Sequence, residues 1–273
     1  MQTYEFFKAE IDKGIALLTF SRPKVNAFSY AVYQEMASLA GDLEVNSAVK
    51  VVVFTAPSDA RAWIGGADLN DFLTLDHDSR LKRYEVVNAA TRGFANFSRP
   101  VIGAINSHAV GAGMTFAASQ CDIRVVSEDA FFSMPQIDRG LTAGGGAYFT
   151  RINMPAGKVR EIIFTGRRFP ATELKDTGLC DYLLPRDQVV PKSLEIAELI
   201  AAKSFTALQA VKRCANAVQD MTFADAMKFT QEEAARLTAG PDSKEGIKAF
   251  LEKRDPAYLS GSGDPSGKSV SQS

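Results

Sequence analysis

Two short glycine-rich turns are the segments of this chain best suited to chemistry. The first is Trp63-Ile64-Gly65-Gly66-Ala67-Asp68-Leu69, and the second is His108-Ala109-Val110-Gly111-Ala112-Gly113-Met114. Each joins a predicted strand to helix-like sequence, where backbone N–H groups lack intrahelical partners. Each turn alone has a simpler interpretation, as a tight turn with Asp68 capping a helix or as close strand–helix packing. Together they could direct two N–H groups at one point and form an oxyanion hole.

Motifs for nucleotide or metal chemistry are incomplete. Neither GxxxxGKS nor GxxxxGKT occurs, and Gly144-Gly145-Gly146 lacks both the lysine and the GxGxxG spacing. The 3 cysteines are far apart with no CxxC pair, and with only 2 histidines beside them we expect no metal site. An odd number of unclustered cysteines is typical of a reducing compartment.

The composition excludes several classes of protein. Among 273 residues, 31 Lys and Arg balance 32 Asp and Glu, which argues against nucleic-acid binding. Hydrophobic residues make up 46% of the chain, so most of it should fold. The first residues do not resemble a secretory signal, and no apolar stretch reaches the length of about 18 residues that a transmembrane helix needs. We therefore expect a cytoplasmic protein with no nucleic-acid or membrane partner.

The segments that must position these turns alternate between predicted strands and helices. Strands are predicted over 4–11, 15–20, 51–55, 101–105, 123–126 and 130–133. Helices are predicted from Ser29 onward and over 79–97, 114–119, 156–165, 171–178, 187–203, 204–219, 222–239 and 242–253, and 56–76 is predicted to be a loop. The strands are too apolar for a sheet with one solvated face, so the pattern indicates an α/β fold in layers.

An ordered set of motifs resembles the crotonase superfamily, the enoyl-CoA hydratase/isomerase group, from about residue 4 to residue 258. Besides the two turns, the set comprises Arg22-Pro23-Lys24 with Asn26-Ala27, Arg99-Pro100-Val101-Ile102 with Asn106, Cys121-Asp122-Ile123, 132–140, 174–181 and 245–254. The resemblance implies a spiral of ββα turns over 1–200 that binds acyl-CoA. It further implies a helical trimerisation region over 201–258 and assembly into trimers or hexamers. The Ser/Gly-rich composition of the last residues separately predicts a disordered tail over 259–273.

The resemblance also implies that the substrate is an acyl-CoA thioester, with CoA as part of the substrate and no separate cofactor. By position, the N–H groups of Ala67 and Ala112 would hold the thioester oxygen. Phe250 and Lys253 of a neighbouring subunit would contact adenine and phosphate, although Lys253 alone would be interpreted as a solvated helix charge. The implied substrate-binding residues are Lys24, Gly65, Gly66, Asp68, Gly111, Gly113, Gly144, Phe250 and Lys253.

The acid–base positions depart from the family pattern. Hydratases of the family use two glutamates to position and activate water, and the matching residues here are Thr115 and Gln136. Neither side chain titrates near pH 7. A further position, aspartate in other members, is Gly144. Asp138 could serve as a relocated base if the segment after Gln136 is extended; alternatively, it pairs with Arg139 or another cation outside the site.

Other residues are weaker candidates. His108 is a lone histidine at a strand end, which is more often structural, and Tyr148 could donate a proton. A largely apolar acyl pocket is indicated by side chains that would equally suit the core: Phe72, Leu73, Leu75, Met134, Leu141 and Phe149.

The sequence thus predicts an enzyme that binds an acyl-CoA thioester and stabilises its enolate, with impaired two-glutamate hydration. Two alternatives stay open. One is a different reaction on the same enolate, such as C–C bond cleavage, decarboxylation or thioester hydrolysis. The other is a non-catalytic acyl-CoA-binding subunit.

Overall fold

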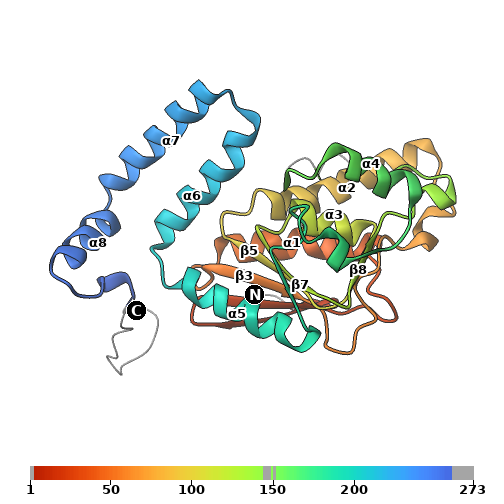
Figure 1. The fold of residues 1–273 in the computed structure, drawn as a ribbon, viewed down its shortest axis with the longest axis horizontal. Helices are drawn as coiled ribbons and strands as arrows, with labels where there is room; N and C mark the ends of the chain where they lie inside the picture. The colour runs from red at the N-terminus through yellow and green to blue at the C-terminus, as the bar shows by residue number, and fades with distance from the viewer. Residues whose placement is uncertain (1–2, 144–148, 150–151, 260–273) are drawn as a thin grey trace.

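Two β-sheets with helices packed around them occupy the first part of the chain (Figure 1). The structure, a computed structural model, describes residues 3–143, 149 and 152–259. The larger sheet has the order β1 (Phe7–Asp12), β2 (Ile15–Phe20), β3 (Val51–Thr55), β5 (Val101–Ile105), β7 (Ile123–Ser127), β10 (Tyr182–Leu184). The smaller sheet has the order β4 (Ala62–Ile64), β6 (His108–Val110), β8 (Phe131–Ser133), β9 (Phe169–Pro170).

Successive turns of the chain each contribute one strand to each sheet and then a helix. β3, β5 and β7 are parallel neighbours in the larger sheet, and β4, β6 and β8 are parallel neighbours in the smaller one. The helices that follow these pairs are α2 (His77–Ala95), α3 (Ala112–Ser119) and α4 (Ala156–Thr165). This arrangement confirms the predicted layers and the spiral of ββα turns.

The central strands are buried on both faces, which explains their apolar sequences. Every residue of β3 and β5 is buried. Val51 and Val53 pack in a cluster with α5 (Arg186–Ala201), whereas Val52 and Phe54 belong to the main core beside α1 (Tyr30–Val45). A strand shielded on both faces by helices can be apolar at every position.

An aromatic cluster connects α3 to both sheets. The ring of Phe116 lies 4.8 Å from that of Phe54 in β3 and 5.8 Å from that of Trp63 in β4, measured between centroids. It also contacts Phe94 of α2 at 5.7 Å. Because these side chains are almost fully buried, they fix the start of α3 against the strands beneath it.

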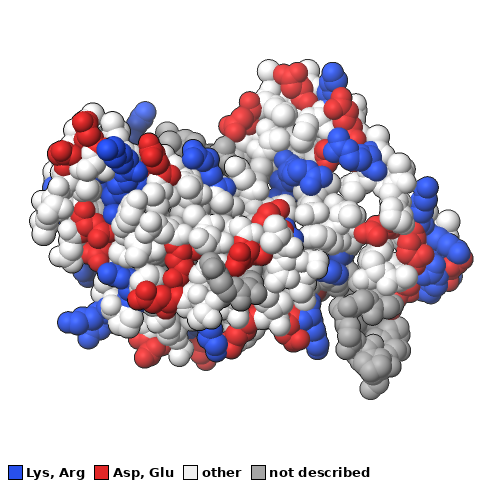
Figure 2. Space-filling view, turned by 180° about the vertical axis from the view of Figure 1, so that it is seen from behind, with Lys and Arg blue, Asp and Glu red and all other residues white. Residues whose placement is uncertain are grey.

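Three further helices extend away from the sheets (Figure 1): α6 (Phe205–Ala217), α7 (Phe223–Thr238) and α8 (Pro241–Leu251). Lys212 anchors α6 to the sheets, because its Nζ donates to Asp122 Oδ2 and to the Arg99 carbonyl, each at 2.7 Å. Basic and acidic side chains are interspersed over the face shown in Figure 2. None of the helices in the described ranges is long and apolar enough to cross a membrane.

Some short elements differ from the sequence predictions. β4 lies within 56–76, which was predicted to be a loop, and β9 and β10 were not predicted. Strands of two or three residues are too short to show a period, and their partners are distant in sequence. The predicted helix over 171–178 is wrong, because only Ala171–Leu174 is helical there, as a 3₁₀ turn.

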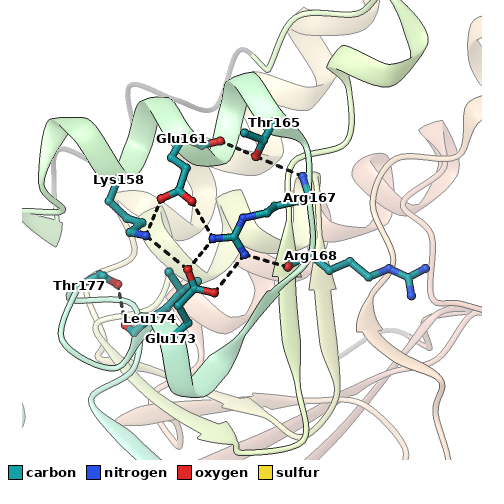
Figure 3. Close-up of polar contacts among 8 residues, drawn as sticks. All are labelled: Lys158, Glu161, Thr165, Arg167, Arg168, Glu173, Leu174 and Thr177. Atoms are coloured by element: carbon teal, nitrogen blue, oxygen red, sulfur yellow. Dashed lines mark hydrogen bonds and ion pairs between the residues drawn. The ribbon is translucent and has the colours of Figure 1, made fainter.

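A cluster of four charged side chains joins α4 to this 3₁₀ turn (Figure 3). Arg167 bridges Glu161 at 2.7 Å and Glu173 at 2.6 Å, and Lys158 lies 2.6 Å from Glu161. Arg167 also stacks on Phe169, 3.6 Å from the ring centroid. The hydrogen bond from Lys158, and then that from Arg167, lower the pKa of Glu161, and hydrogen bonding from Arg167 lowers the pKa of Glu173.

We predict that this cluster stabilises the fold at neutral pH and not in acid. A carboxylate whose pKa is lowered on folding contributes stability above its unfolded pKa and loses it as the pH falls through the folded value. Glu161→Gln combined with Glu173→Gln should lower the melting temperature at pH 7, with the difference shrinking below the ordinary glutamate value of 4.5. Melting curves between pH 3 and pH 8, with the exposed Glu128→Gln as control, test this; a pH-independent difference contradicts it.

We also predict that Gly113 is required for α3 to approach β4. A Cβ added to Gly113 would lie 2.4 Å from the carbonyl oxygen of Ile64, closer than real Cβ contacts come. Gly113→Ala should therefore reduce the free energy of unfolding by about 1–3 kcal/mol, as overpacking typically does. Gly157→Ala in α4, where an added Cβ meets nothing within 4 Å, should instead stabilise by about 0.5–1 kcal/mol. Denaturant titration measures the free energy of unfolding of both variants. Equal changes in the two variants would refute the requirement for glycine at position 113.

Candidate functional site

The carboxyl ends of β4, β6 and β8 meet at one edge of the smaller sheet. These strands pair in parallel, so the segments that leave them start side by side. Ala67, Ala112 and Gln136 each follow a strand end within three residues. All three line one cavity of about 390 Å³. Strand pairing thus assembles a single site from segments far apart in sequence.

The first turn is held against the segment before α1. Phe28 N–H donates to the carbonyl of Gly66 at 2.7 Å, and Asp68 N–H donates to the carbonyl of Phe28 at 2.9 Å. The N–H of Ala67 lies between these two bonds and has no hydrogen-bond partner in the described ranges. Gly66 has a φ of +104°, which glycine adopts without strain.

The second turn begins α3 and touches the first. Gly111 N–H donates to the carbonyl of Ser133 at 2.8 Å, and Gly111 has a φ of +53°. Ala112 is the first residue of α3, so its N–H has no intrahelical acceptor, and no other described residue accepts it. A Cβ on Gly111 would be 3.7 Å from Gly66 Cα, so the two turns are in contact.

Thr115 and Gln136, at the positions of the family glutamates, also line this cavity. The side-chain amide of Gln136 lies against Gly111: its Nε2 would be 3.4 Å from a Cβ there. Its Oε1 is buried and has no hydrogen-bond partner in the part of the chain that the structure describes. A buried amide oxygen without a partner is energetically costly, so a bound ligand or water would satisfy it.

The segment after Gln136 is not extended, so the argument that Asp138 shares its face is wrong. Ile137–Arg139 is a 3₁₀ helix that ends at Gly140, which has a φ of +64°. Asp138 is exposed and does not line the cavity; its Oδ2 lies near Gly166, 3.3 Å from where a Cβ would be. Within the described residues Asp138 forms no ion pair with Arg139, whose Nη1 instead donates to the carbonyl of Pro135.

The charged side chains in the described lining of the cavity are all positive. Its charged lining residues are Arg80 and Arg139, and the described lining contains no Asp, Glu, Lys or His. The internal residues outside the described ranges, 144–148 and 150–151, include no Asp or Glu either. The chain therefore places no carboxylate acid–base pair among these residues.

Asp68 and His108 serve the framework. The Oδ2 of Asp68 forms an ion pair with Arg22 at 2.8 Å, and its Oδ1 caps the following 3₁₀ turn through Asn70 N–H at 3.1 Å. Burial raises the pKa of Asp68, but these hydrogen bonds outweigh it and hold the pKa below its ordinary value. His108 stacks on Phe131 at 3.9 Å, outside the cavity lining; burial, followed by nearby arginines, lowers its pKa.

Three other residues predicted to bind substrate are not found at the cavity. Lys24, Phe250 and Lys253 are exposed and do not line the cavity of their own chain. Gly144 and Tyr148 lie outside the described residues.

Of the apolar side chains proposed for the acyl pocket, Phe72 and Leu141 line the cavity. Met134 and Phe149 are instead core residues, Leu73 is 83% exposed, and Leu75 is half-buried outside the lining.

One face of α2 was not identified from the sequence as part of the site, although the helical spacing of its residues was visible. Arg80, Tyr84, Val87, Asn88 and Thr91 recur at helical intervals and line the cavity.

Tyr33 of α1 also lines the cavity, and it was not predicted from the sequence as a site residue. Burial raises its pKa to about 12, although Arg83 and Arg80 act in the opposite direction. Its hydroxyl is therefore protonated at neutral pH.

Comparisons with known proteins agree with this geometry. A family model described as enoyl-CoA hydratase/isomerase matches residues 10–261. The chain is 28% identical to a short-chain-enoyl-CoA hydratase of Clostridium acetobutylicum, over 90% of this chain and 94% of that protein. It is 29% identical to the 2,3-dehydroadipyl-CoA hydratase of Escherichia coli, over 89% and 94%. The crystal structure of an enoyl-CoA hydratase from Mycobacterium smegmatis matches with a TM-score of 0.88 and 25% identity, over 93% of this chain and 99% of that one. The chain belongs to the enoyl-CoA hydratase/isomerase family.

Proposed function

We propose that this protein is an enzyme that binds an acyl-CoA thioester and stabilises its enolate with the backbone N–H groups of Ala67 and Ala112. The observation that carries this proposal is the contact between two turns, each with one N–H that no described residue accepts, at the wall of the same cavity. CoA enters as part of the substrate, so no separate cofactor is required.

The chemistry follows from where negative charge develops. When a thioester becomes an enolate, charge accumulates on its carbonyl oxygen. N–H dipoles that are already fixed stabilise this charge without reorganising, and one such donor typically contributes about 10²–10³-fold in rate. Here the neighbouring backbone groups of both turns are held by hydrogen bonds, which keeps the two donors in place.

Proton transfer is the step for which this site is poorly equipped. Thr115 and Gln136 can hydrogen-bond a substrate or a water, but neither exchanges a proton near pH 7. Hydration that depends on two carboxylates should therefore be slow.

The absence of acidic side chains from the described lining favours a second candidate reaction, decarboxylation. Loss of CO₂ breaks the Cα–carboxylate bond and leaves its electron pair in the enolate, so no base is needed to form it. C–C bond cleavage, thioester hydrolysis and non-catalytic binding are the remaining alternatives, and turnover of a panel of acyl-CoA thioesters distinguishes among them.

We also propose self-association through the C-terminal helices. Several of their large apolar side chains are exposed: Phe223 at 83%, Phe250 at 82%, Leu251 at 74% and Ile247 at 56%. Clusters of this kind typically mark association surfaces. A trimer or a hexamer would also allow Phe250 and Lys253 to reach the CoA of a neighbouring subunit.

The proposed function predicts that Ala112→Pro strongly reduces turnover. Proline is tolerated at the first position of a helix, but it has no N–H. Turnover of the best substrate in the panel should fall by about 10²–10³-fold, while Ala112→Gly, which keeps the N–H, should remain close to the native rate. Initial rates, with circular dichroism to check folding, make the comparison. Equal activity of the proline variant and the native protein would remove Ala112 from the site.

A second prediction concerns the missing acid–base pair. Thr115→Glu combined with Gln136→Glu should raise the rate of crotonyl-CoA hydration, because each positioned acid or base typically contributes about 10²–10⁴-fold. Thr115→Gln is the matched control, since it adds a similar side chain without a titratable group. Hydration is followed by loss of the enoyl absorbance. A native protein that already hydrates crotonyl-CoA as fast as the double variant would show that its acid–base groups lie elsewhere.

A further inference from the structure

Arg80 and Arg139 give the cavity a positive charge that no carboxylate in the described ranges neutralises. Both line the cavity, and neither forms an ion pair with a carboxylate within the described ranges. Arg83, in the same helix as Arg80, is the useful contrast. It is buried and pairs with Asp71 at 2.8 Å, as an arginine with a structural role does. The two lining arginines have no such internal partner.

Arg80 is held in a defined position rather than extending freely into solvent. Its guanidinium lies 4.1 Å from the ring centroid of Phe72 and 4.7 Å from that of Tyr84. Its Nη2 donates to the Tyr84 hydroxyl at 3.1 Å. A guanidinium has five N–H donors, so most of those on Arg80 remain available. Stacking fixes the group before a ligand arrives, which lowers the entropic cost of binding an anion.

Arg139 approaches the cavity from the 3₁₀ helix that follows Gln136. Its Nη1 donates to the carbonyl of Pro135 at 2.6 Å, which fixes one edge of the guanidinium. Pro135 and Gln136 are themselves cavity residues, so Arg139 belongs to the same wall as the side chain nearest the second turn. Two arginines with free donors suit a planar, bidentate anion.

We propose that the acyl group of the substrate carries a carboxylate, which Arg80 and Arg139 bind. The substrate class is thus the CoA thioesters of dicarboxylic acids. This inference rests on the proposed function, because it places the thioester at the turns of Ala67 and Ala112. Arg80 is half-buried, so a purely aliphatic acyl group would place apolar atoms against its guanidinium without supplying a counter-charge, which is unfavourable. A carboxylate on the substrate would neutralise this positive charge, because the described lining contains no carboxylate.

The test is calorimetric binding of succinyl-, glutaryl- and adipyl-CoA, each compared with the monocarboxylyl-CoA of equal carbon number: butyryl-, valeryl- and hexanoyl-CoA. At one or more lengths the dicarboxylyl thioester should bind about ten- to hundredfold more tightly, the usual effect of hydrogen bonds to charged groups. Arg80→Gln and Arg139→Gln should each reduce this preference, and the double variant should abolish it. Arg92→Gln, an exposed change on the same helix outside the cavity, should keep it.

The three monocarboxylyl thioesters, whose acyl groups are uncharged, separate the possible failures. Their undiminished binding to Arg80→Gln and Arg139→Gln shows that these variants are folded and still hold CoA. A preference that is absent at all three lengths, or that persists in the double variant, overturns the proposal. Equal weakening of both series overturns it too, because the arginines would then bind the phosphates of CoA. If none of the six thioesters binds to folded protein, the proposed function itself fails, and this inference fails with it.

Discussion

The parallel pairing of β4, β6 and β8 is the constraint on which the site depends. Each strand has only three residues, yet their register decides which backbone groups leave the sheet together. The second turn then requires glycine at two positions. Gly113 lies against the Ile64 carbonyl, and Gly111 lies against Gly66 and the Gln136 amide. A Cβ at Gly113 would clash with that carbonyl oxygen, whereas a Cβ at Gly111 would make ordinary contacts, and glycine there serves the φ of +53°.

Packing behind the site transmits this constraint to the rest of the core. Phe116 follows the second turn by one helical turn and contacts rings from both sheets and from α2. Trp63 immediately precedes Ile64 and donates through Nε1 to the carbonyl of Phe54 at 3.4 Å. A rigid core of this kind resists sub-ångström displacement, so the two N–H groups keep their relative position. Preorganisation of the site is thus a property of the buried aromatic cluster as much as of the turns.

The turns, the layered fold and the family could be predicted from sequence because their signals are local. Glycine pairs after apolar runs indicate strand-to-helix turns, and fully apolar strands indicate buried sheets. Asp138 was misplaced because its orientation depends on a 3₁₀ turn ended by Gly140 and packed near Gly166, which no local pattern shows. The spacing of Arg80, Tyr84 and Val87 was visible, but only the structure shows that this face of α2 borders the cavity.

The two kinds of functional group in this site differ in how freely they can change. An N–H donor belongs to the backbone, so Ala112 can supply it as well as glycine can, provided that the turn keeps its shape. Thr115, Gln136, Arg80 and Arg139 instead line the cavity, and none of them belongs to a strand. Strand pairing therefore fixes the relative position of the two turns, whereas the chemical character of the cavity is set by the side chains of its lining. In a cavity whose described lining has arginines and no carboxylate, proton abstraction is disfavoured and anion binding is favoured, so both properties follow from the same few positions.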